Sequence, residues 1–393
     1  MFVTPLFKLM ADKQASDLFF TAGAPIQIKI NGTVMPVNSQ KLTPEQIKQI
    51  CYELMTTQQI TEFDERLEMN FARRGEPGPD GEAVGNYRIN IFQQRNTLGM
   101  VVRFVKPDVP AFDTLGLPPI LKEIIMEKLG LILIVGSTGS GKSTTMASMI
   151  DYRNATRSGH ILTIEDPVEF AFRHKKSIVN QREVRVDTHS FEAALISAMR
   201  EAPDLLMIGE VREKETLQSA LLFAQTGHLC MTTLHANNSY NALNRIINFF
   251  PRDMREAVLA DLAIGIRCVI SQRLVRTADG RRVPAVEVLL NTKFIQELIN
   301  KGELGSIKEA MEQSMAPGSQ TFEQALFNHY AAGTITLDEA LANADSPTNL
   351  RWLIDNATKN VDKPGALPAT ADAPKARDDF SSIQLNLGAL DKP

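Results

Sequence analysis

Apolar and polar residues change their spacing along this chain, and the middle of the chain has the clearest pattern. Four short apolar runs, at 131–135, 160–164, 205–208 and 228–233, alternate there with segments of helical spacing. Continuous apolar runs of this length are typical of strands buried on both faces. Their alternation with helices predicts an α/β fold, with a parallel sheet covered by helices on both sides.

The N-terminal stretch has the shorter alternation of a small α+β domain. Ile26–Ile30 and Thr33–Val37 flank Asn31-Gly32, which is the strongest short-range signal for a hairpin. Residues 73–81 are rich in Gly and Pro and are predicted to form a loop. Two further strands are expected after it, over Tyr87–Gln93 and Gly99–Val105.

Several helix starts are marked by a Thr that is followed three residues later by Gln or Glu, the capping-box pattern. Thr43 begins such a pattern in the N-terminal stretch, and the apolar positions behind it have helical spacing: Ile47, Ile50, Cys51 and Leu54. Thr321 and Thr336 begin two more. The chain is therefore predicted to be mainly helical after about residue 290.

These patterns predict a division of the chain into domains. An N-terminal domain is expected over 1–107, a linker over 108–118, the sheet domain with its C-terminal helices over 119–360, and a disordered tail over 361–393. The linker follows Pro107 and Pro110, and the tail has repeated prolines among Ala, Asp and Lys.

The composition is that of an ordinary globular protein. Of its 393 residues, 44% are hydrophobic and 22% are charged, and 42 basic residues against 46 acidic ones give a net charge of −4. No block of basic residues indicates a nucleic-acid or membrane partner. The N-terminus lacks the pattern of a signal peptide, and no apolar run is long enough to span a bilayer. We therefore expect a cytoplasmic protein that contacts a membrane only through partners.

The cysteines give no sign of a metal site or a disulfide framework. Cys51, Cys230 and Cys268 are far apart in the sequence. No C-x-x-C pair occurs, so we expect each to be a small buried apolar residue.

The sharpest chemical signal follows the apolar run 131–135. Residues 136–143, Gly-Ser-Thr-Gly-Ser-Gly-Lys-Ser, fit the phosphate-binding pattern G-x-x-x-x-G-K-[ST] between a predicted strand and a predicted helix. Glycines let successive backbone N–H groups point at phosphate oxygens, Lys142 supplies a positive charge, and the Ser143 hydroxyl can hold Mg²⁺. A simple Gly/Ser-rich turn is the alternative, which the strand–loop–helix context disfavours. The residues expected to bind ATP here are Gly136, Ser137, Thr138, Gly139, Ser140, Gly141, Lys142, Ser143 and Thr144.

Polar residues follow the later strands where a Mg-triphosphate would lie, because ligands bind beyond the carboxyl ends of parallel strands. Glu165, Asp166 and Glu169 follow one strand, and Glu210 follows another at the position of a Walker B carboxylate. Glu210 can hold Mg²⁺ or polarise the attacking water. The usual Walker B aspartate is missing, since Asp204 precedes its strand. A solvated acidic loop is the plain alternative for the three clustered carboxylates.

Two histidines flank the strand at 228–233. His235 follows the strand and is expected near the γ-phosphate, while His228 stands at its start and is expected to contribute to nucleotide binding. A single histidine at a strand end is often only structural.

Taken together, four motifs resemble in order and spacing those of the secretion and type IV pilus ATPase superfamily. They are Gly136–Ser143 (Walker A), Ile164–Glu169 (Asp box), Gly209–Arg212 (Walker B) and Thr226–Ala236 (His box). The resemblance covers roughly residues 1–350. It implies a PAS-like N-terminal domain, a RecA-like ATPase domain, Mg²⁺ and ATP as ligands, and a homohexameric ring with ATP between protomers.

Within that superfamily the chain looks like the retraction ATPases, the PilT branch. Assembly ATPases usually carry a tetracysteine zinc element, which is missing here. In this family arginines of the N-terminal domain complete each site, and Arg88 and Arg103 match that pattern. Both arginines could equally be ordinary surface residues. Arg212 follows the Walker B glutamate.

Two departures resemble the accessory, PilU-type retraction ATPases, which act beside a PilT-like ATPase. The retraction motif of PilT proteins carries two arginines, whereas residues 293–301 of this chain keep its apolar spacing and lose both. The tail beyond Val361 is also foreign to PilT. The resemblance thus implies an accessory motor for pilus retraction and twitching motility, at the inner-membrane base of the pilus machine and in contact with its platform protein.

Three alternatives stay open. The chain could be an autonomous PilT-type motor, a RecA-like nucleic-acid translocase, or a nucleotide-gated scaffold whose hydrolysis is incidental. A translocase would need basic and aromatic residues along a groove that follows the strand, and no such cluster stands out in the sequence.

Overall fold

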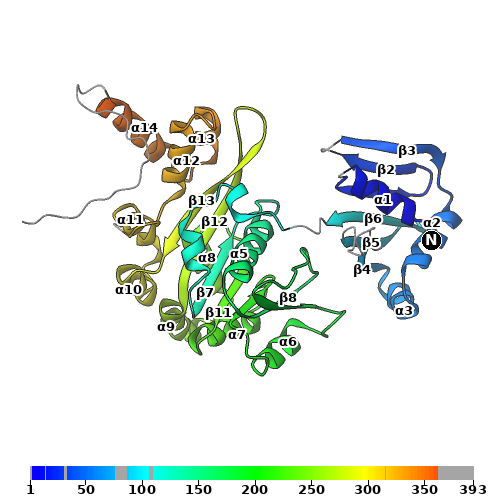
Figure 1. Cartoon of the computed structure of the whole chain (residues 1–393), viewed down its shortest axis with the longest axis horizontal. Helices are drawn as coiled ribbons and strands as arrows, with labels where there is room; N and C mark the ends of the chain where they lie inside the picture. The colour runs from blue at the N-terminus through cyan, green and yellow to red at the C-terminus, as the bar shows by residue number, and fades with distance from the viewer. Residues whose placement is uncertain are drawn as a thin grey trace, which may run out of the picture.

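The computed structural model describes residues 2–13, 15–30, 33–75, 86–105, 109–314 and 316–361. Within these ranges the chain forms a mixed α/β fold with two separate sheets, each with its own apolar core. Figure 1 shows the smaller, N-terminal unit beside the larger one. We call them the N-terminal unit (2–105) and the seven-stranded unit (109–361).

The N-terminal unit is an antiparallel six-stranded sheet with helices on one face. In sheet order the strands are β3 (Thr33–Lys41), β2 (Pro25–Ile30), β1 (Asp17–Thr21), β6 (Thr97–Val105), β5 (Asn86–Gln94) and β4 (Glu68–Arg74). The helices are α1 (Thr4–Asp12), α2 (Pro44–Leu54) and α3 (Thr57–Arg66). One face of β5 and β6 packs in the core, so that Tyr87, Ile89 and Val102 are buried while Arg88 and Arg103 lie on the other face.

The seven-stranded unit has the sheet order β13-β12-β7-β11-β10-β8-β9, in which all neighbours are parallel except β13, which runs antiparallel to β12. In that order the strands are Arg282–Leu290, Ile266–Arg276, Gly130–Val135, Leu229–Leu234, Leu205–Ile208, Gly159–Glu165 and Ser177–Glu183. Successive side chains of the central strands enter opposite cores: Leu131 and Leu133 enter one, Ile132 and Ile134 the other. This two-sided burial explains the uninterrupted apolar runs of the sequence.

Helices cover both faces of this sheet (Figure 1). One face is covered by α6 (Phe191–Ala198), α7 (Lys214–Gln225), α8 (Ser239–Asn248), α9 (Arg255–Gly265), α10 (Lys293–Lys301) and α11 (Ile307–Glu312). The other face is covered by α4 (Ile120–Ile124) and α5 (Lys142–Thr156), with the short 3₁₀ turn Phe112–Thr114. Two further 3₁₀ turns are Arg252–Met254 and Leu304–Ser306.

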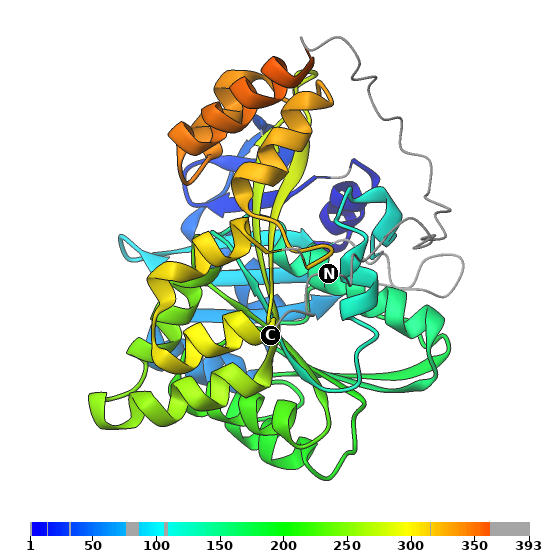
Figure 2. The same cartoon turned by 90° about the vertical axis from the view of Figure 1, so that its left-hand side faces the viewer.

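The last three helices lie at the far end of the β12–β13 hairpin (Figures 1 and 2). They are α12 (Phe322–Ala331), α13 (Leu337–Asn343) and α14 (Pro347–Val361). They form a small separate core with Val275 of β12 and Ala285 of β13, in which Phe322 and Leu350 are buried. We call α12–α14 the C-terminal helices.

Most predicted elements are confirmed. The capping boxes at Thr43 and Thr321 are both present, and the four apolar positions predicted for α2 are its buried residues. Thr336 caps α13 from its side chain, but the reciprocal half of the box is not formed. All three cysteines are buried and free, and burial raises the pKa of Cys51 to about 12.

Other predictions need correction or lie outside the described residues. Arg73 and Arg74 end strand β4 instead of beginning a loop, because they pair with Tyr87 and Asn86 of β5. The rest of the predicted loop, 76–81, the turn Asn31-Gly32, the first linker residue 108 and the tail beyond 361 lie outside the described residues. No helix in the described ranges is long and apolar enough to cross a membrane.

Candidate active site

The phosphate-binding pattern forms a tight loop between β7 and α5. Lys142 is buried, and its Nζ donates to the carbonyl oxygens of Gly136 and Ser137, at 2.9 Å each. Burial lowers the pKa of Lys142, while the nearby Glu169 and Glu210 raise it. The loop therefore keeps a positive charge at its centre, with two carboxylates in electrostatic range.

Glycines are required at two positions of this loop for different reasons. A Cβ on Gly136 would lie 2.4 Å from Ser140 Oγ and 2.6 Å from the carbonyl oxygen of Gln272. Gly141 has a φ of +88°, which side chains rarely adopt, and a Cβ there would lie 2.7 Å from Gln272 Nε2. Any larger residue would push the loop away from its neighbours.

The loop is held from β12 by a residue that the sequence did not single out. Gln272 Nε2 donates to the carbonyl oxygen of Ser140 at 2.8 Å, and its Oε1 accepts from Thr145 Oγ1 at 2.7 Å. Gln272 and Thr145 are both buried. One amide thus fixes the loop and the first turn of α5 together.

The three predicted carboxylates, Glu165 at the end of β8 and Asp166 and Glu169 after it, have different environments. Glu165 is buried, and its Oε1 accepts from Thr163 Oγ1 at 2.7 Å and from Gln181 Nε2 at 3.1 Å. Burial raises its pKa to about 7, although these hydrogen bonds lower it. Asp166 pairs with Arg185 at 3.3 Å, and Glu169 is partly exposed.

Glu210 lies just after β10, two strands from the phosphate loop. Its Oε1 accepts a hydrogen bond from Arg212, and its Oε2 lies 3.8 Å from Nε2 of His235. Burial and the nearby Lys142 lower the pKa of His235, so the ring is neutral at pH 7 and the contact is no ion pair. Glu210 and His235 thus lie together at the carboxyl edge of the sheet, where the loop after β7 places Lys142.

A cleft of about 320 Å³ opens beside these groups. Gly136 and Ser137 form one side, and the loop after β11 forms the other, with His235, Ala236 and Asn237. Asn241 and Arg245 of α8 complete it. Sequence reasoning missed Asn241 and Arg245, since neither belongs to a motif.

Not every predicted site residue joins this group. His228 lies at the opposite end of β11, where its carbonyl oxygen accepts from the N–H of Gly130, and its ring packs edge-on against Phe223. The expectation that His228 binds nucleotide is therefore not supported within its own chain. Asp204 is also at that end, where it accepts from the N–H of His160 at 2.8 Å.

Arg88 and Arg103, the two arginines predicted to complete the site, have different contacts. They are direct cross-strand neighbours on β5 and β6. Arg88 reaches the seven-stranded unit and lies 3.5 Å from Glu169, whereas Arg103 pairs within its own unit, at 2.9 Å from the buried Asp17. Only Arg88 contacts a predicted site residue of the same chain.

The residues present suit Mg²⁺ and a nucleoside triphosphate. Mg²⁺ in such sites takes few protein ligands beside phosphate oxygens and waters, and Ser143 with Glu210 offers such a set. No cluster of three or more His, Cys, Asp or Glu ligands occurs in the described residues. Ser140 Oγ, buried at the loop, has no hydrogen-bond partner within the described part of the chain.

Comparison with known proteins identifies the family. A family described as "Type II/IV secretion system protein" matches residues 2–299. The chain belongs to this family.

Among its relatives are two pilus ATPases of Pseudomonas aeruginosa. The type IV pilus ATPase PilU is 48% identical over 350 residues, covering 89% of this chain and 90% of PilU. The retraction ATPase PilT is 38% identical over 349 residues, covering 89% of this chain and all of PilT. The crystal structure of the pilus retraction motor PilT with bound ADP superimposes with a TM-score of 0.81 at 40% identity, over 89% of this chain and 99% of that one. The resemblance to PilT- and PilU-type ATPases is confirmed.

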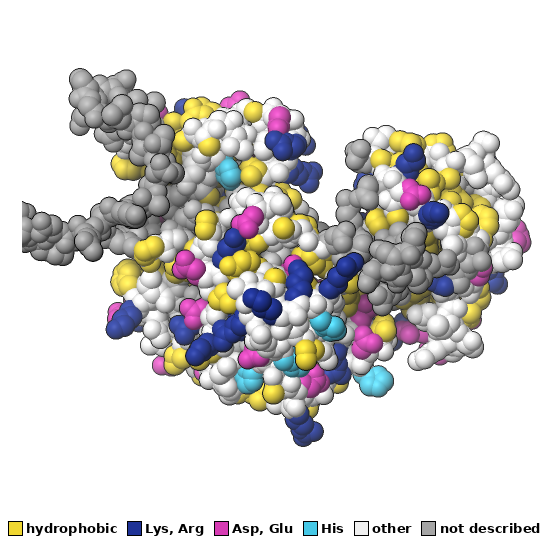
Figure 3. Space-filling view, viewed as in Figure 1, with side chains coloured by type: hydrophobic (Ala, Val, Ile, Leu, Met, Phe, Trp, Pro, Cys, Tyr) yellow, Lys and Arg dark blue, Asp and Glu magenta, His cyan; other side chains and the backbone are white. Residues whose placement is uncertain are grey.

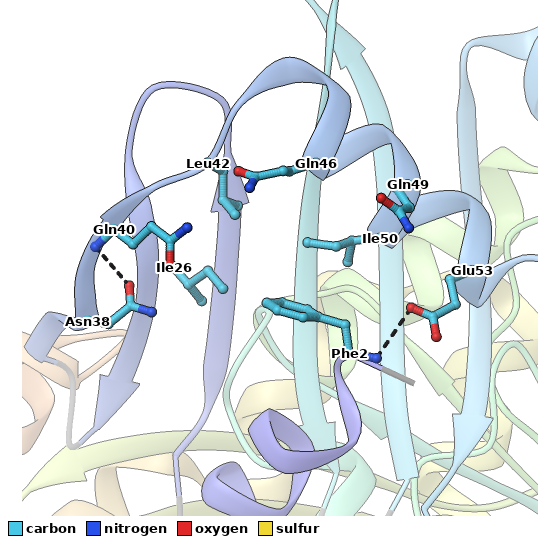
Figure 4. Close-up of a pocket in the computed structure, with 9 residues that line it drawn as sticks. All are labelled: Phe2, Ile26, Asn38, Gln40, Leu42, Gln46, Gln49, Ile50 and Glu53. Carbon is cyan, nitrogen blue, oxygen red and sulfur yellow. Dashed lines mark hydrogen bonds between the residues drawn. The ribbon is translucent and has the colours of Figure 1, made fainter.

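A second hollow of this ATPase, of about 230 Å³, lies in the N-terminal unit (Figure 4). Ile26, Leu42 and Ile50 form its apolar part, and Phe2 lies beside them. Among the described residues that line it, the one charged side chain is the acidic Glu53. Without a cation or a glycine loop it does not suit a phosphate.

Proposed function

We propose that this chain is a Mg²⁺-dependent ATP-hydrolysing motor for type IV pilus retraction and twitching motility. The observation that carries the proposal is the meeting of Lys142, Glu210 and His235 at the carboxyl edge of one parallel sheet. Family membership and the similarity to PilT and PilU support the same conclusion.

Within the site each group has a role that its environment suits. The loop 136–144 and Lys142 bind the phosphates, and Ser143 and Glu210 would hold Mg²⁺, which neutralises charge that develops on the transferred phosphoryl group. Glu210 also orients the attacking water, with Glu165 or Glu169 as the alternative group for this step. His235 lines the cleft on the side assigned to the γ-phosphate, and Asp166 and Arg212 are assigned to nucleotide binding as well.

The finer architecture is also part of the proposal. We assign residues 1–107 to a PAS-like domain, 108–118 to a linker, 119–360 to a RecA-like domain with C-terminal helices, and 361–393 to a tail. A homohexamer places ATP between protomers, where Arg88 and Arg103 of an N-terminal domain complete the site. The ring acts in the cytoplasm, against the inner-membrane platform of the pilus machine.

An accessory role beside a PilT-like ATPase is favoured by α10. This helix corresponds to the retraction motif, and it keeps the apolar spacing, with Ile295, Leu298 and Ile299 buried, but has neither of the motif's two arginines. An autonomous motor is the second candidate. A nucleic-acid translocase is less well supported, because on the face shown in Figure 3 basic side chains are interspersed with acidic ones.

Labelled-pilus imaging tests the proposal in two strains. In one, this ATPase is the only retraction ATPase; in the other, it works beside a catalytically inactive PilT. Retraction only in the second strain, and its loss on Lys142→Ala, is expected for the accessory motor. Retraction in the first strain would make the motor autonomous, and retraction that survives Lys142→Ala would reduce the chain to a scaffold.

A further inference from the structure

Arg273 joins the cleft to the C-terminal helices. It lies on β12, and its guanidinium makes hydrogen bonds to three partners. It donates to the carbonyl oxygen of Asn343 at the end of α13, to the carbonyl oxygen of Asn237 at 3.2 Å, and to the carboxylate of Asp345. Asn237 lines the cleft, whereas the other two partners belong to the C-terminal helices and the turn that joins them.

Asp345 closes this cluster from the other side. Its second carboxylate oxygen accepts from Nδ2 of Asn238 at 2.8 Å. Asn238 is buried and caps α8, because its Oδ1 accepts from the N–H of Asn241 at 3.0 Å. Two successive residues of the loop after β11, Asn237 and Asn238, are therefore held by the pair Arg273–Asp345.

The cluster is well shielded from water. The side chains of Arg273 and Asp345 are 22% and 13% exposed, and the guanidinium stacks over the ring of Phe322 at 4.0 Å. A shielded, charge-assisted contact whose guanidinium also donates to two backbone carbonyl oxygens constrains geometry better than an exposed ion pair.

We propose that Arg273 and Asp345 are positioning residues for ATP hydrolysis. They hold the loop 235–238 in place beside Gly136 and Ser137, and they make its position depend on the C-terminal helices. Because α12–α14 pack in one small core at the far end of the β12–β13 hairpin, a displacement of these helices would move Asn343 and Asp345 with them. Arg273 would then move with these partners. Its hydrogen bond to the carbonyl oxygen of Asn237 would displace the backbone of the loop, and His235 with it. The inference rests on the proposed ATPase function.

The test compares Arg273→Met, Arg273→Lys and Asp345→Ala with wild type in the full-length protein. Methionine keeps the packing over Phe322 but removes every hydrogen-bond donor. Lysine keeps the positive charge but lacks the planar guanidinium group with its several donors. Arg276→Met is the matched control, an exposed arginine on the same strand. We measure kcat for ATP, the Kd of a fluorescent ADP analogue and the thermal unfolding midpoint.

We expect Arg273→Met and Asp345→Ala each to lower kcat about tenfold or more, since a small displacement of a catalytic element has effects of that size. The Kd for ADP should stay within about threefold of wild type. The double variant should be no slower than the slower single variant, because both changes break one unit. Arg273→Lys should recover part of kcat, and Arg276→Met should match wild type.

A kcat within about threefold of wild type in both single variants would overturn the inference. So would additive effects in the double variant, or a loss of ADP binding equal to the loss of kcat. If Arg273→Met does not fold, Asp345→Ala and Arg273→Lys decide by the same criteria. Failure of the proposed function is separate, because the wild-type protein itself would then not hydrolyse ATP.

Discussion

Among single residues, Glu165 shows most clearly how burial changes chemistry at this site. Its position after β8 could be read from the sequence, but its burial could not. Thr163 and Gln181 both donate to it, yet burial outweighs these hydrogen bonds and raises its pKa to about 7. Glu165 thus changes its charge near neutral pH.

This pKa predicts a pH dependence of stability. An acid whose pKa is raised on folding favours the folded state below its unfolded pKa, near 4.5, and this contribution is lost as the pH rises through about 7. Relative to Glu165→Gln, wild type should therefore lose stability over this range, by roughly 3 kcal/mol at most.

Denaturant unfolding at pH 5 and pH 8 measures this difference. Glu297→Gln, an exposed residue of α10, is the control and should follow wild type at both values. Equal pH dependence in wild type and Glu165→Gln would show that the carboxyl group is not perturbed by burial.

Other residues show where sequence reasoning reached its limit. Lys142, Glu210 and His235 follow apolar runs. Because the carboxyl ends of parallel strands lie at one edge of the sheet, the sequence predicts that these residues lie together. His228 was grouped with them because it belongs to the same motif, but it stands at the start of β11, and a strand separates its two ends. Gln272 and Arg245 carry no motif, and only the folded sheet brings them to the loop.

At the scale of elements, the phosphate loop depends on a strand that is distant in sequence. β12 pairs with β7, with Ser271 opposite Val135, and so places Gln272 against the loop that follows β7. The strands of the middle stretch were predictable because burial on both faces leaves a continuous apolar run. The pairing of the strands was not predictable, because the order β12-β7-β11 depends on contacts between residues at least 99 positions apart.

Gln272→Met should weaken nucleotide binding. The change leaves the buried Thr145 hydroxyl without its acceptor and the loop without its donor at Ser140, at a cost of about 1–3 kcal/mol for the unpaired buried group. We expect the affinity for ATP to fall about tenfold, measured by titration with a fluorescent ATP analogue.

The matched control is Gln218→Met, an exposed glutamine on α7. It should bind ATP like wild type. Unchanged affinity in Gln272→Met, with a lowered unfolding midpoint, would mean that Gln272 supports the fold and not the loop geometry.

At the scale of the whole molecule, the N-terminal unit reaches the site through one arginine. Arg88 contacts Glu169 of its own chain at 3.5 Å, with both side chains more than a third exposed. Such a contact adds little stability, so it leaves Arg88 available to a neighbouring protomer. Arg103 is held more firmly by the buried Asp17.

If a neighbouring protomer completes each site, two inactive variants should rescue one another. Arg88→Ala and Lys142→Ala are each expected to lose ATP hydrolysis. Mixed rings contain sites in which an intact Lys142 faces an intact Arg88, so mixing should restore part of the activity. No recovery from subunits shown to exchange would place Arg88 in the site of its own chain.

The most direct test of the central claim is ATP turnover by purified Glu210→Gln. The substitution keeps size and hydrogen bonding but removes the charge that would hold Mg²⁺ and orient water. We predict that ATP still binds while kcat falls by about 10² or more, and that Glu213→Gln, an exposed neighbour, behaves like wild type. Turnover near the wild-type rate in Glu210→Gln would contradict this account of the active site.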